Sequence, residues 1–155
     1  MNTIRQKHVL EDLIKTFGFK TGIEIGTLDG DTAGYLLRQI PDLHLTIIDP
    51  EPNLKVFDQN TSDFKDRYRL IQKTSDEAVK DLPGCRFDFV WIDGDHSEEQ
   101  VTRDIINYID LCTRVVGGHD YGVENYFPGV KRAVDKFFNN DVINIGDDFT
   151  WWVNL

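Results

Sequence analysis

The chain has 155 residues, 40% of them hydrophobic and 28% charged, which is typical of one globular domain over residues 1–155. Acidic residues outnumber basic ones by 27 to 17, and the net charge of −10 argues against nucleic acid and membranes as partners. No apolar run reaches the ~20 residues of a membrane span, and residues 1–7 lack the apolar core of a secretory signal, so a cytoplasmic protein with free Cys85 and Cys112 is expected.

The first predicted element is an amphipathic helix near the N-terminus. Apolar residues recur there at helical spacing: Val9, Leu10, Leu13, Ile14 and Phe17. Short β-branched runs then alternate with helical patterns, which predicts a doubly wound α/β fold with a mostly parallel sheet. Seven strands are expected, at residues 22–25, 45–48, 68–72, 87–92, 114–116, 142–145 and 149–153.

Two helices in the second half of the chain are well marked. The first follows Asp95, where Ser97 and Gln100 form the pattern of a capping box. Its apolar face comprises Val101, Ile105, Ile109 and Cys112. The second begins near Pro128, a favoured first-turn residue. Its inward face comprises Val130, Ala133, Val134 and Phe137. Only residues 146–148 join the last two strands, so the sheet is expected to end in an antiparallel pair.

The first predicted strand runs into a glycine turn that is rich in acidic residues. Gly26 lets the backbone approach a ligand closely, and the segment lacks the G-x-G-x-x-G spacing of a dinucleotide site. Glu24, Asp29 and Asp31 would place carboxylates where a pyrophosphate would lie, whereas the cations of S-adenosylmethionine tolerate them. The alternative is a turn that merely joins strand to helix.

Two further strand ends carry polar residues suited to a nucleoside. Asp49 ends the second strand, where a carboxylate can accept hydrogen bonds from both ribose hydroxyls. A helix cap or an Asp-Pro turn is the alternative for this residue. Ser75 follows the third strand, where it could pair with the edge of an adenine or simply cap the next helix.

The ends of the fourth and fifth strands carry the sharpest group of candidate residues: Asp93, Asp95, His96, His119 and Asp120. If these strands are neighbours, Asp93 and the His119–Asp120 pair converge, because parallel strands lie ~4.8 Å apart. Oxygen ligands suit Mg²⁺, and a histidine also admits Mn²⁺, Fe²⁺ or Zn²⁺. His96 is placed to act as a general base, with a helix-start hydrogen bond as its alternative role. A packed core histidine is the alternative for His119.

These motifs resemble the class I S-adenosylmethionine-dependent methyltransferases of the macrocin and rhamnosyl O-methyltransferase type. The resemblance covers nearly the whole chain, through residues 23–27, 48–49, 92–97, 118–121 and 128–134. It implies a Rossmann-like sheet of order 3-2-1-4-5-7-6 with an antiparallel last strand. It also implies cofactor-binding roles for Glu24, Gly26, Thr27 and Thr32 around the methionine moiety, for Asp49 at the ribose, and for Ser75 and Asp93 in the same pocket.

The same resemblance implies a metal-assisted reaction. Asp93, His119 and Asp120 would hold a divalent metal such as Mg²⁺ or Mn²⁺, and His96 with Asp93 would carry catalysis. The chain departs from the family at His119, where a carboxylate is expected. It departs again at residues 112–114, where a Pro-Gly-Gly turn usually precedes the fifth strand.

We therefore expect methyl transfer to a hydroxyl of a small molecule or glycan. One alternative is a non-haem Fe²⁺ oxygenase that uses His96, His119 and a carboxylate. Another is a catalytically silent S-adenosylmethionine-binding module, since only residues 1–20 and 122–127 are spare for a lid. With so little lid, a pocket rimmed by Tyr126, Phe127, Trp151 and Trp152 would accept an extended glycan or be completed in a homodimer.

Overall fold

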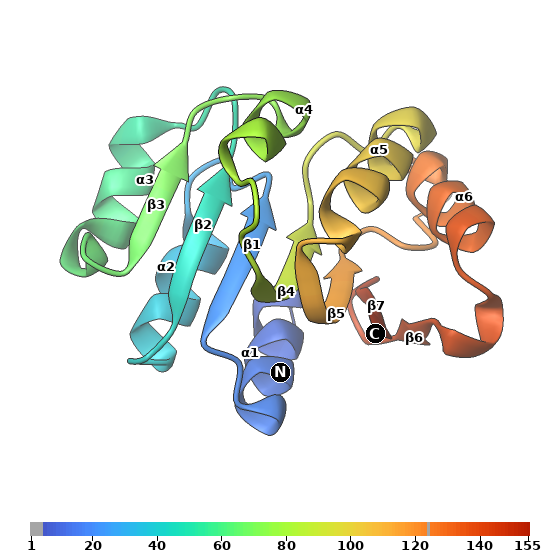
Figure 1. Cartoon of the computed structure of the whole chain (residues 1–155), viewed down its shortest axis with the longest axis horizontal. Coiled ribbons are helices and arrows are strands. Elements are labelled where there is room, and N and C mark those ends of the chain that lie inside the picture. The colour runs from blue at the N-terminus through green and yellow to red at the C-terminus, as the bar shows by residue number, and fades with distance from the viewer. Residues whose placement is uncertain (1–4, 124) are drawn as a thin grey trace.

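A computed structural model describes residues 5–123 and 125–155 and contains one seven-stranded sheet of order β3-β2-β1-β4-β5-β7-β6 (Figure 1). The strands are β1 (Thr21–Ile25), β2 (His44–Ile48), β3 (Tyr68–Ile71), β4 (Phe87–Ile92), β5 (Cys112–Gly118), β6 (Asn144–Ile145) and β7 (Trp151–Asn154). The helices are α1 (Gln6–Phe17), α2 (Asp31–Gln39), α3 (Leu54–Thr61), α4 (Ser75–Ala78), α5 (Glu98–Ile109) and α6 (Pro128–Phe137). The doubly wound fold and its strand order are confirmed.

The order of the strands reverses beside β1. The chain builds outward from β1 to β2 and β3, then returns to place β4 on the other side of β1, with β1 parallel to both β2 and β4. Strand β5 runs parallel to β4, while β7 is antiparallel to both β5 and β6. The carboxyl ends of β1 and β4 therefore flank the switch point where ligands bind in such sheets.

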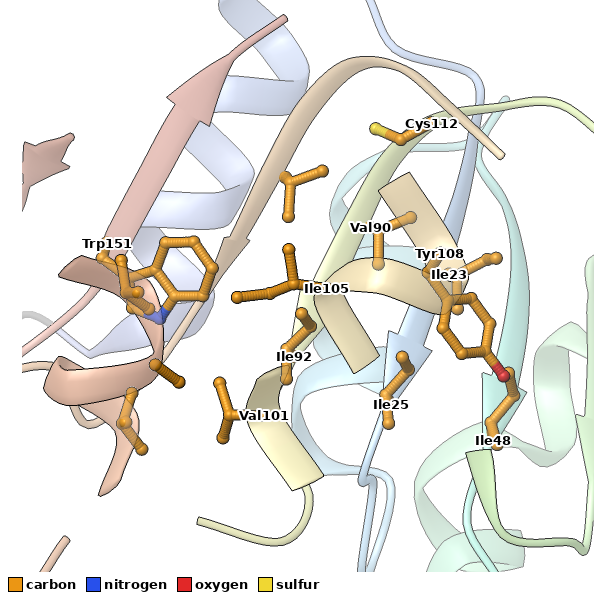
Figure 2. Close-up of a cluster of buried hydrophobic side chains, with 14 of the residues drawn as sticks. Ile23, Ile25, Ile48, Val90, Ile92, Val101, Ile105, Tyr108, Cys112 and Trp151 are labelled. Carbon is orange, nitrogen blue, oxygen red and sulfur yellow. The ribbon is translucent and has the colours of Figure 1, made fainter. Parts of the chain in front are cut away.

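Two apolar layers hold helices on the two faces of the sheet. One layer joins α1, α2 and α3 to alternate strand residues such as Ile47, Phe89 and Trp91. The other joins α4, α5 and α6 to the intervening residues such as Val90 and Ile92. Figure 2 shows part of this second layer, with Ile105 of α5 among the side chains of the strands. The alternation of side chains along each strand thus buries both faces, as a sheet covered on both sides requires.

The two last strands begin later than the sequence predicts. Residues Asn140–Val142 form a 3-10 helix, η3, and β6 starts only at Asn144. Strand β7 starts at Trp151 because Asp148 and Phe149 adopt φ of 63° and 58°, a left-handed conformation that a strand cannot contain. The antiparallel pairing of β6 with β7 is nevertheless as expected.

Three side-chain placements also differ from the predictions. Cys112 begins β5 instead of extending the apolar face of α5, so the turn ahead of β5 is made by Asp110 and Leu111. Phe137 is 39% exposed because it lies in the last turn of α6, where the helix runs out from the sheet. Trp151 belongs to the buried core (Figure 2) and does not rim a pocket. Among the described residues, no helix is long and apolar enough to cross a membrane.

Candidate functional site

A cavity of about 920 Å³ opens at the carboxyl ends of β1, β2 and β4. Its walls come from the loops that follow these strands, from the first turn of α2 and from α5. Every site residue expected from the sequence lines it: Glu24, Gly26, Thr27, Thr32, Asp49, Ser75, Asp93, His96, His119 and Asp120. The fold thus brings all the candidates to one place, while their individual roles rest on the contacts described next.

The glycine turn after β1 is tightly packed. Gly26 has a φ of 83°, and its N–H donates a 2.8 Å hydrogen bond to the carbonyl oxygen of Ile48. A Cβ atom at this position would lie 2.2 Å from the carbonyl oxygen of Asp93. Only glycine fits there, because both the conformation and the contact with the end of β4 exclude a side chain.

Glu24 is a buried carboxyl group beside this turn. Its side chain is 4% exposed and accepts a 2.9 Å hydrogen bond from Thr27 Oγ1. Burial raises the pKa of Glu24 to about 8, and the nearby charges of Asp93 and Asp49 act in the same direction. Ionisation of Glu24 is therefore costly when no cation is nearby, and a cationic group in the cavity would favour it.

Asp49 supports the turn from the end of β2. Its Oδ2 accepts hydrogen bonds from the N–H groups of Thr27 (3.0 Å) and Leu28 (2.8 Å). Its Oδ1 accepts a 2.9 Å bond from the N–H of Glu51. The carboxylate thus shapes the backbone that borders the cavity, in addition to presenting its free lone pairs there. Leu28 adopts a φ of 52°, which these bonds help to hold.

Asp93, His119 and Asp120 converge as the sequence predicts. One potential ligand atom from each lies within 4.8 Å of the others. The convergence follows from the parallel pairing, which continues past the strands: the N–H of Asp93 bonds to Ile25 and the N–H of His119 bonds to Ile92. Asp95 does not join this cluster, because its Oδ1 accepts a 2.7 Å hydrogen bond from the N–H of Ser97.

His96 points into the same cluster. Its Nε2 lies 2.8 Å from Asp120 Oδ2 and 3.6 Å from Asp93 Oδ1, and its ring stacks on Phe127 at 4.2 Å between centroids. The adjacent carboxylates of Asp120 and Asp93 raise the pKa of His96 to about 9. This imidazole is therefore protonated near neutral pH. A general base with an ordinary pKa was expected from the sequence instead.

Two residues that contact this cluster, Gln6 and Asp148, were not predicted from the sequence. The side chain of Gln6, at the start of α1, donates a 2.5 Å hydrogen bond to Asp93 Oδ2 and accepts one of 2.8 Å from Trp91 Nε1. Asp148, in the turn before β7, accepts a 2.7 Å bond from the N–H of Gln6 and lies 3.5 Å from His119 Nε2. No local motif marks either residue, since both reach the site only through packing of distant elements.

Ser75, the first residue of α4, lies in a second polar cluster of the cavity wall, with Gln100 and Asp104 of α5. Its hydroxyl donates to Asp104 Oδ1 at 2.5 Å and accepts from Gln100 Nε2 at 3.0 Å. The expected capping box of α5 is therefore only half formed. Ser97 Oγ accepts from the N–H of Gln100, but the Gln100 side chain turns to Ser75 and Asp104.

The aromatic rim is smaller than expected. Phe127 contacts His96, and Tyr126 is 79% exposed beside it. Trp152 packs on the α1 side of the sheet, and Trp151 is buried in the core. Arg5 and Gln6 line the cavity instead, so the N-terminal segment contributes to the site itself.

The family model for a methyltransferase domain matches residues 23–121. This chain therefore belongs to that methyltransferase family, and the expected class of enzyme is confirmed. The matched residues include the glycine turn, Asp49 and the whole Asp93–Asp120 cluster. A search of curated protein sequences gives no match.

Solved structures of methyltransferases share the fold. The O-methyltransferase TomG of Streptomyces achromogenes, involved in tomaymycin synthesis and solved with S-adenosylmethionine (SAM), has a TM-score of 0.77 at 18% identity, covering 96% of this chain and 79% of its own. An O-methyltransferase of Bacillus cereus in complex with S-adenosylhomocysteine (SAH) has a TM-score of 0.77 at 17% identity, with coverage of 97% and 80%. The SAH-bound methyltransferase PaMTH1 of Podospora anserina has a TM-score of 0.72 at 16% identity, with coverage of 96% and 76%.

Proposed function

We propose that this protein is a SAM-dependent O-methyltransferase of the macrocin and rhamnosyl type, acting on a hydroxyl of a small molecule or glycan. The observation that carries the proposal is that a buried carboxyl, Glu24, and the Asp93–His119–Asp120 cluster lie in the same cavity. A methyl donor with cationic groups and an acceptor hydroxyl need these two environments side by side. Membership of a methyltransferase family favours this function over the oxygenase alternative.

The cavity fits SAM. Its volume of about 920 Å³ lies within the usual range for small-molecule sites. Glu24 would accept the ammonium group, Gly26 allows the backbone to approach the ligand, and Asp49 would bind the ribose hydroxyls. The complexes of TomG with SAM and of the Bacillus cereus enzyme with SAH support this choice of ligand.

A divalent metal also fits the residues present. Asp93, His119 and Asp120 would hold it, because they offer two carboxylates and an imidazole, with His119 Nδ1 facing both acids. A bound divalent ion lowers the pKa of a hydroxyl and orients it. The nitrogen donor makes Mn²⁺, Fe²⁺ or Zn²⁺ suitable alongside Mg²⁺.

The chain's own groups would position the acceptor and move its proton. Asp120 and the ring of Phe127 fix the orientation of His96, which would take the proton from the acceptor hydroxyl. The hydroxyl oxygen then forms its bond to the methyl carbon while the carbon–sulfur bond breaks, in one in-line displacement. The exposed Tyr126 and the limited lid suit a glycan acceptor or a site completed by a second subunit.

Calorimetric titration tests the ligand. SAM and SAH should bind with micromolar affinity, and NAD⁺ should not, because the turn offers carboxylates where a pyrophosphate would lie. Titrations with and without Mg²⁺ or Mn²⁺ should give similar affinities for SAH, since the metal would bind the acceptor hydroxyl and not the donor. Tight binding of NAD⁺ without binding of SAM would reject the proposal.

A further inference from the structure

Asp104 is a buried acid whose carboxylate is only half satisfied. It lies in the middle of α5, is 1% exposed, and borders the cavity. Its Oδ1 accepts two hydrogen bonds, from Ser75 Oγ at 2.5 Å and Gln100 Nε2 at 2.9 Å. Its Oδ2 is buried and has no hydrogen-bond partner among residues 5–123 and 125–155.

An oxygen in this position is costly to the folded protein. Burial raises the pKa of Asp104 to about 6, against the two hydrogen bonds, and the charges of Asp76 and Asp95 raise it as well. Buried polar atoms normally have a hydrogen-bond partner, so a carboxylate oxygen without one requires a specific explanation. Because Asp104, Ser75 and Gln100 all line the cavity, a bound ligand can supply that partner.

The position of Asp104 relative to the proposed donor site indicates which part of the ligand would face its Oδ2. Glu24 lies one residue before the end of β1, Asp49 directly follows β2, and Ser75 comes after β3, the next strand outward. A nucleoside whose ribose is held at Asp49 can therefore extend its base toward the wall formed by Ser75, Gln100 and Asp104. This step rests on the proposed function, since it takes the ligand to be an adenosyl compound.

We infer that Asp104 is a base-selecting residue, which accepts a hydrogen bond through Oδ2 from the exocyclic amine of the adenine. An ionised carboxylate can only accept, so it pairs with a 6-amino purine. A 6-oxo purine would present a carbonyl oxygen to it, and two buried acceptors would then face each other without a proton. Ser75 and Gln100 hold the other oxygen and fix the orientation of the carboxylate.

The simpler explanation is that Asp104 only clamps Ser75 and Gln100 together. Both roles predict that removing the carboxylate harms the site, so loss of affinity alone does not separate them. The relative affinity for a 6-amino and a 6-oxo base separates the two roles, because a residue that never touches the ligand has no influence on this preference.

The test is calorimetric titration of the full chain with SAH and with S-inosylhomocysteine, which differs in carrying the 6-oxo base. At pH 8, above the pKa of about 6, Asp104 is ionised. The wild-type protein should then prefer SAH by roughly 10-fold or more, the effect of leaving a buried acceptor unpaired. In Asp104→Asn, the amide oxygen can keep the bonds from Ser75 and Gln100 while its NH₂ faces the base. The preference should therefore fall to near unity or reverse.

Asp76→Asn is the matched control, because Asp76 is a nearby acid that accepts a 2.9 Å bond from Asn107 and does not line the cavity. It should keep the wild-type preference. Equal affinity of the wild-type protein for the two compounds would overturn the inference, as would an Asp104→Asn variant that keeps the wild-type ratio. Both of those results leave SAH binding and the proposed function intact, whereas failure of the wild type to bind either compound removes both.

Discussion

Gln6 and Asp93 lie 87 positions apart in the sequence, yet the Gln6 side-chain amide donates a 2.5 Å hydrogen bond to Asp93 Oδ2. This bond ties the first turn of α1 to the end of the central strand β4 and holds the carboxylate of Asp93, whose other oxygen, Oδ1, faces His119 and His96. The N-terminal helix is therefore coupled to the chemistry of the site, although no motif lies within it.

The first prediction follows from this contact. Gln6→Ala should weaken Mn²⁺ binding by about 10-fold, because the bond from Gln6 orients the Asp93 carboxylate, and loss of a partner that orients a metal ligand lowers the affinity for the ion. Calorimetry or electron paramagnetic resonance of Mn²⁺ measures the affinity. Lys7→Met is the control, since Lys7 pairs with Asp31 and does not contact Asp93. Unchanged or tighter binding in Gln6→Ala would show that Gln6 does not support the metal site.

The second prediction concerns Asp49. Asp49→Ala removes the acceptor of three backbone N–H groups as well as the proposed ribose contact. It should weaken SAH binding by ~1–3 kcal/mol and also lower the free energy of unfolding by a similar amount. Titration with SAH and urea unfolding measure the two effects, and Glu51→Ala, which keeps the backbone N–H of residue 51, is the control. Unchanged stability would contradict the structural part of this role.

The third prediction uses the raised pKa of Glu24, about 8 in the ligand-free protein. At pH 7 this carboxyl is mostly protonated, and a ligand ammonium beside it should lower its pKa and release the proton. Titrations with SAH in buffers of different ionisation enthalpy should show release approaching one proton. Glu24→Gln should release close to none and bind SAH more weakly. Equal proton release in both proteins would place the ammonium elsewhere.

The fourth prediction concerns the reaction. Chelation of divalent ions should abolish turnover and leave SAH binding nearly intact, and Asp120→Ala should have the same effect. His96→Ala should lower the rate by ~10²–10⁴-fold, the usual contribution of a general base. The wild-type rate should rise with pH as His96 loses its proton. If the chelated enzyme and Asp120→Ala both retain full activity, the metal role is wrong and His96 acts alone.

The fifth prediction is the pH dependence of stability without metal. The pKa of His96 rises from 6.5 to about 9 on folding, so the folded protein keeps a proton that the unfolded chain loses in between. The stabilisation from the His96–Asp120 pair is therefore complete below pH 6.5 and is lost as the pH rises through about 9. Urea unfolding in the presence of a chelator should show the difference between wild type and His96→Gln shrinking over this range. A constant difference would mean that the pair does not form in solution.

Much of the fold was predictable because it depends on local patterns. Alternating side chains and short crossovers indicate which segments become strands, whereas the order of the strands was implied by the resemblance to the methyltransferase family. The glycine turn was recognisable for the same reason, since the conformation at Gly26 excludes other residues. The misplaced start of β6 came from the 3-10 helix at Asn140–Val142, and that of β7 from the left-handed residues Asp148 and Phe149, which no pattern marks.

The sequence by itself determined which residues gather at the switch point, because the ends of parallel strands must meet at one edge of the sheet. Only the tertiary structure decided how they pair. The raised pKa of His96 depends on the distance to Asp120, and the contacts of Gln6 and Asp148 with the cluster depend on how α1 and the β6–β7 turn pack. The sequence likewise does not indicate the unpaired oxygen of Asp104, because its pattern only places this acid on a helix. Hydrogen bonding and desolvation are set by a few ångströms across the fold, and no spacing along the chain encodes them.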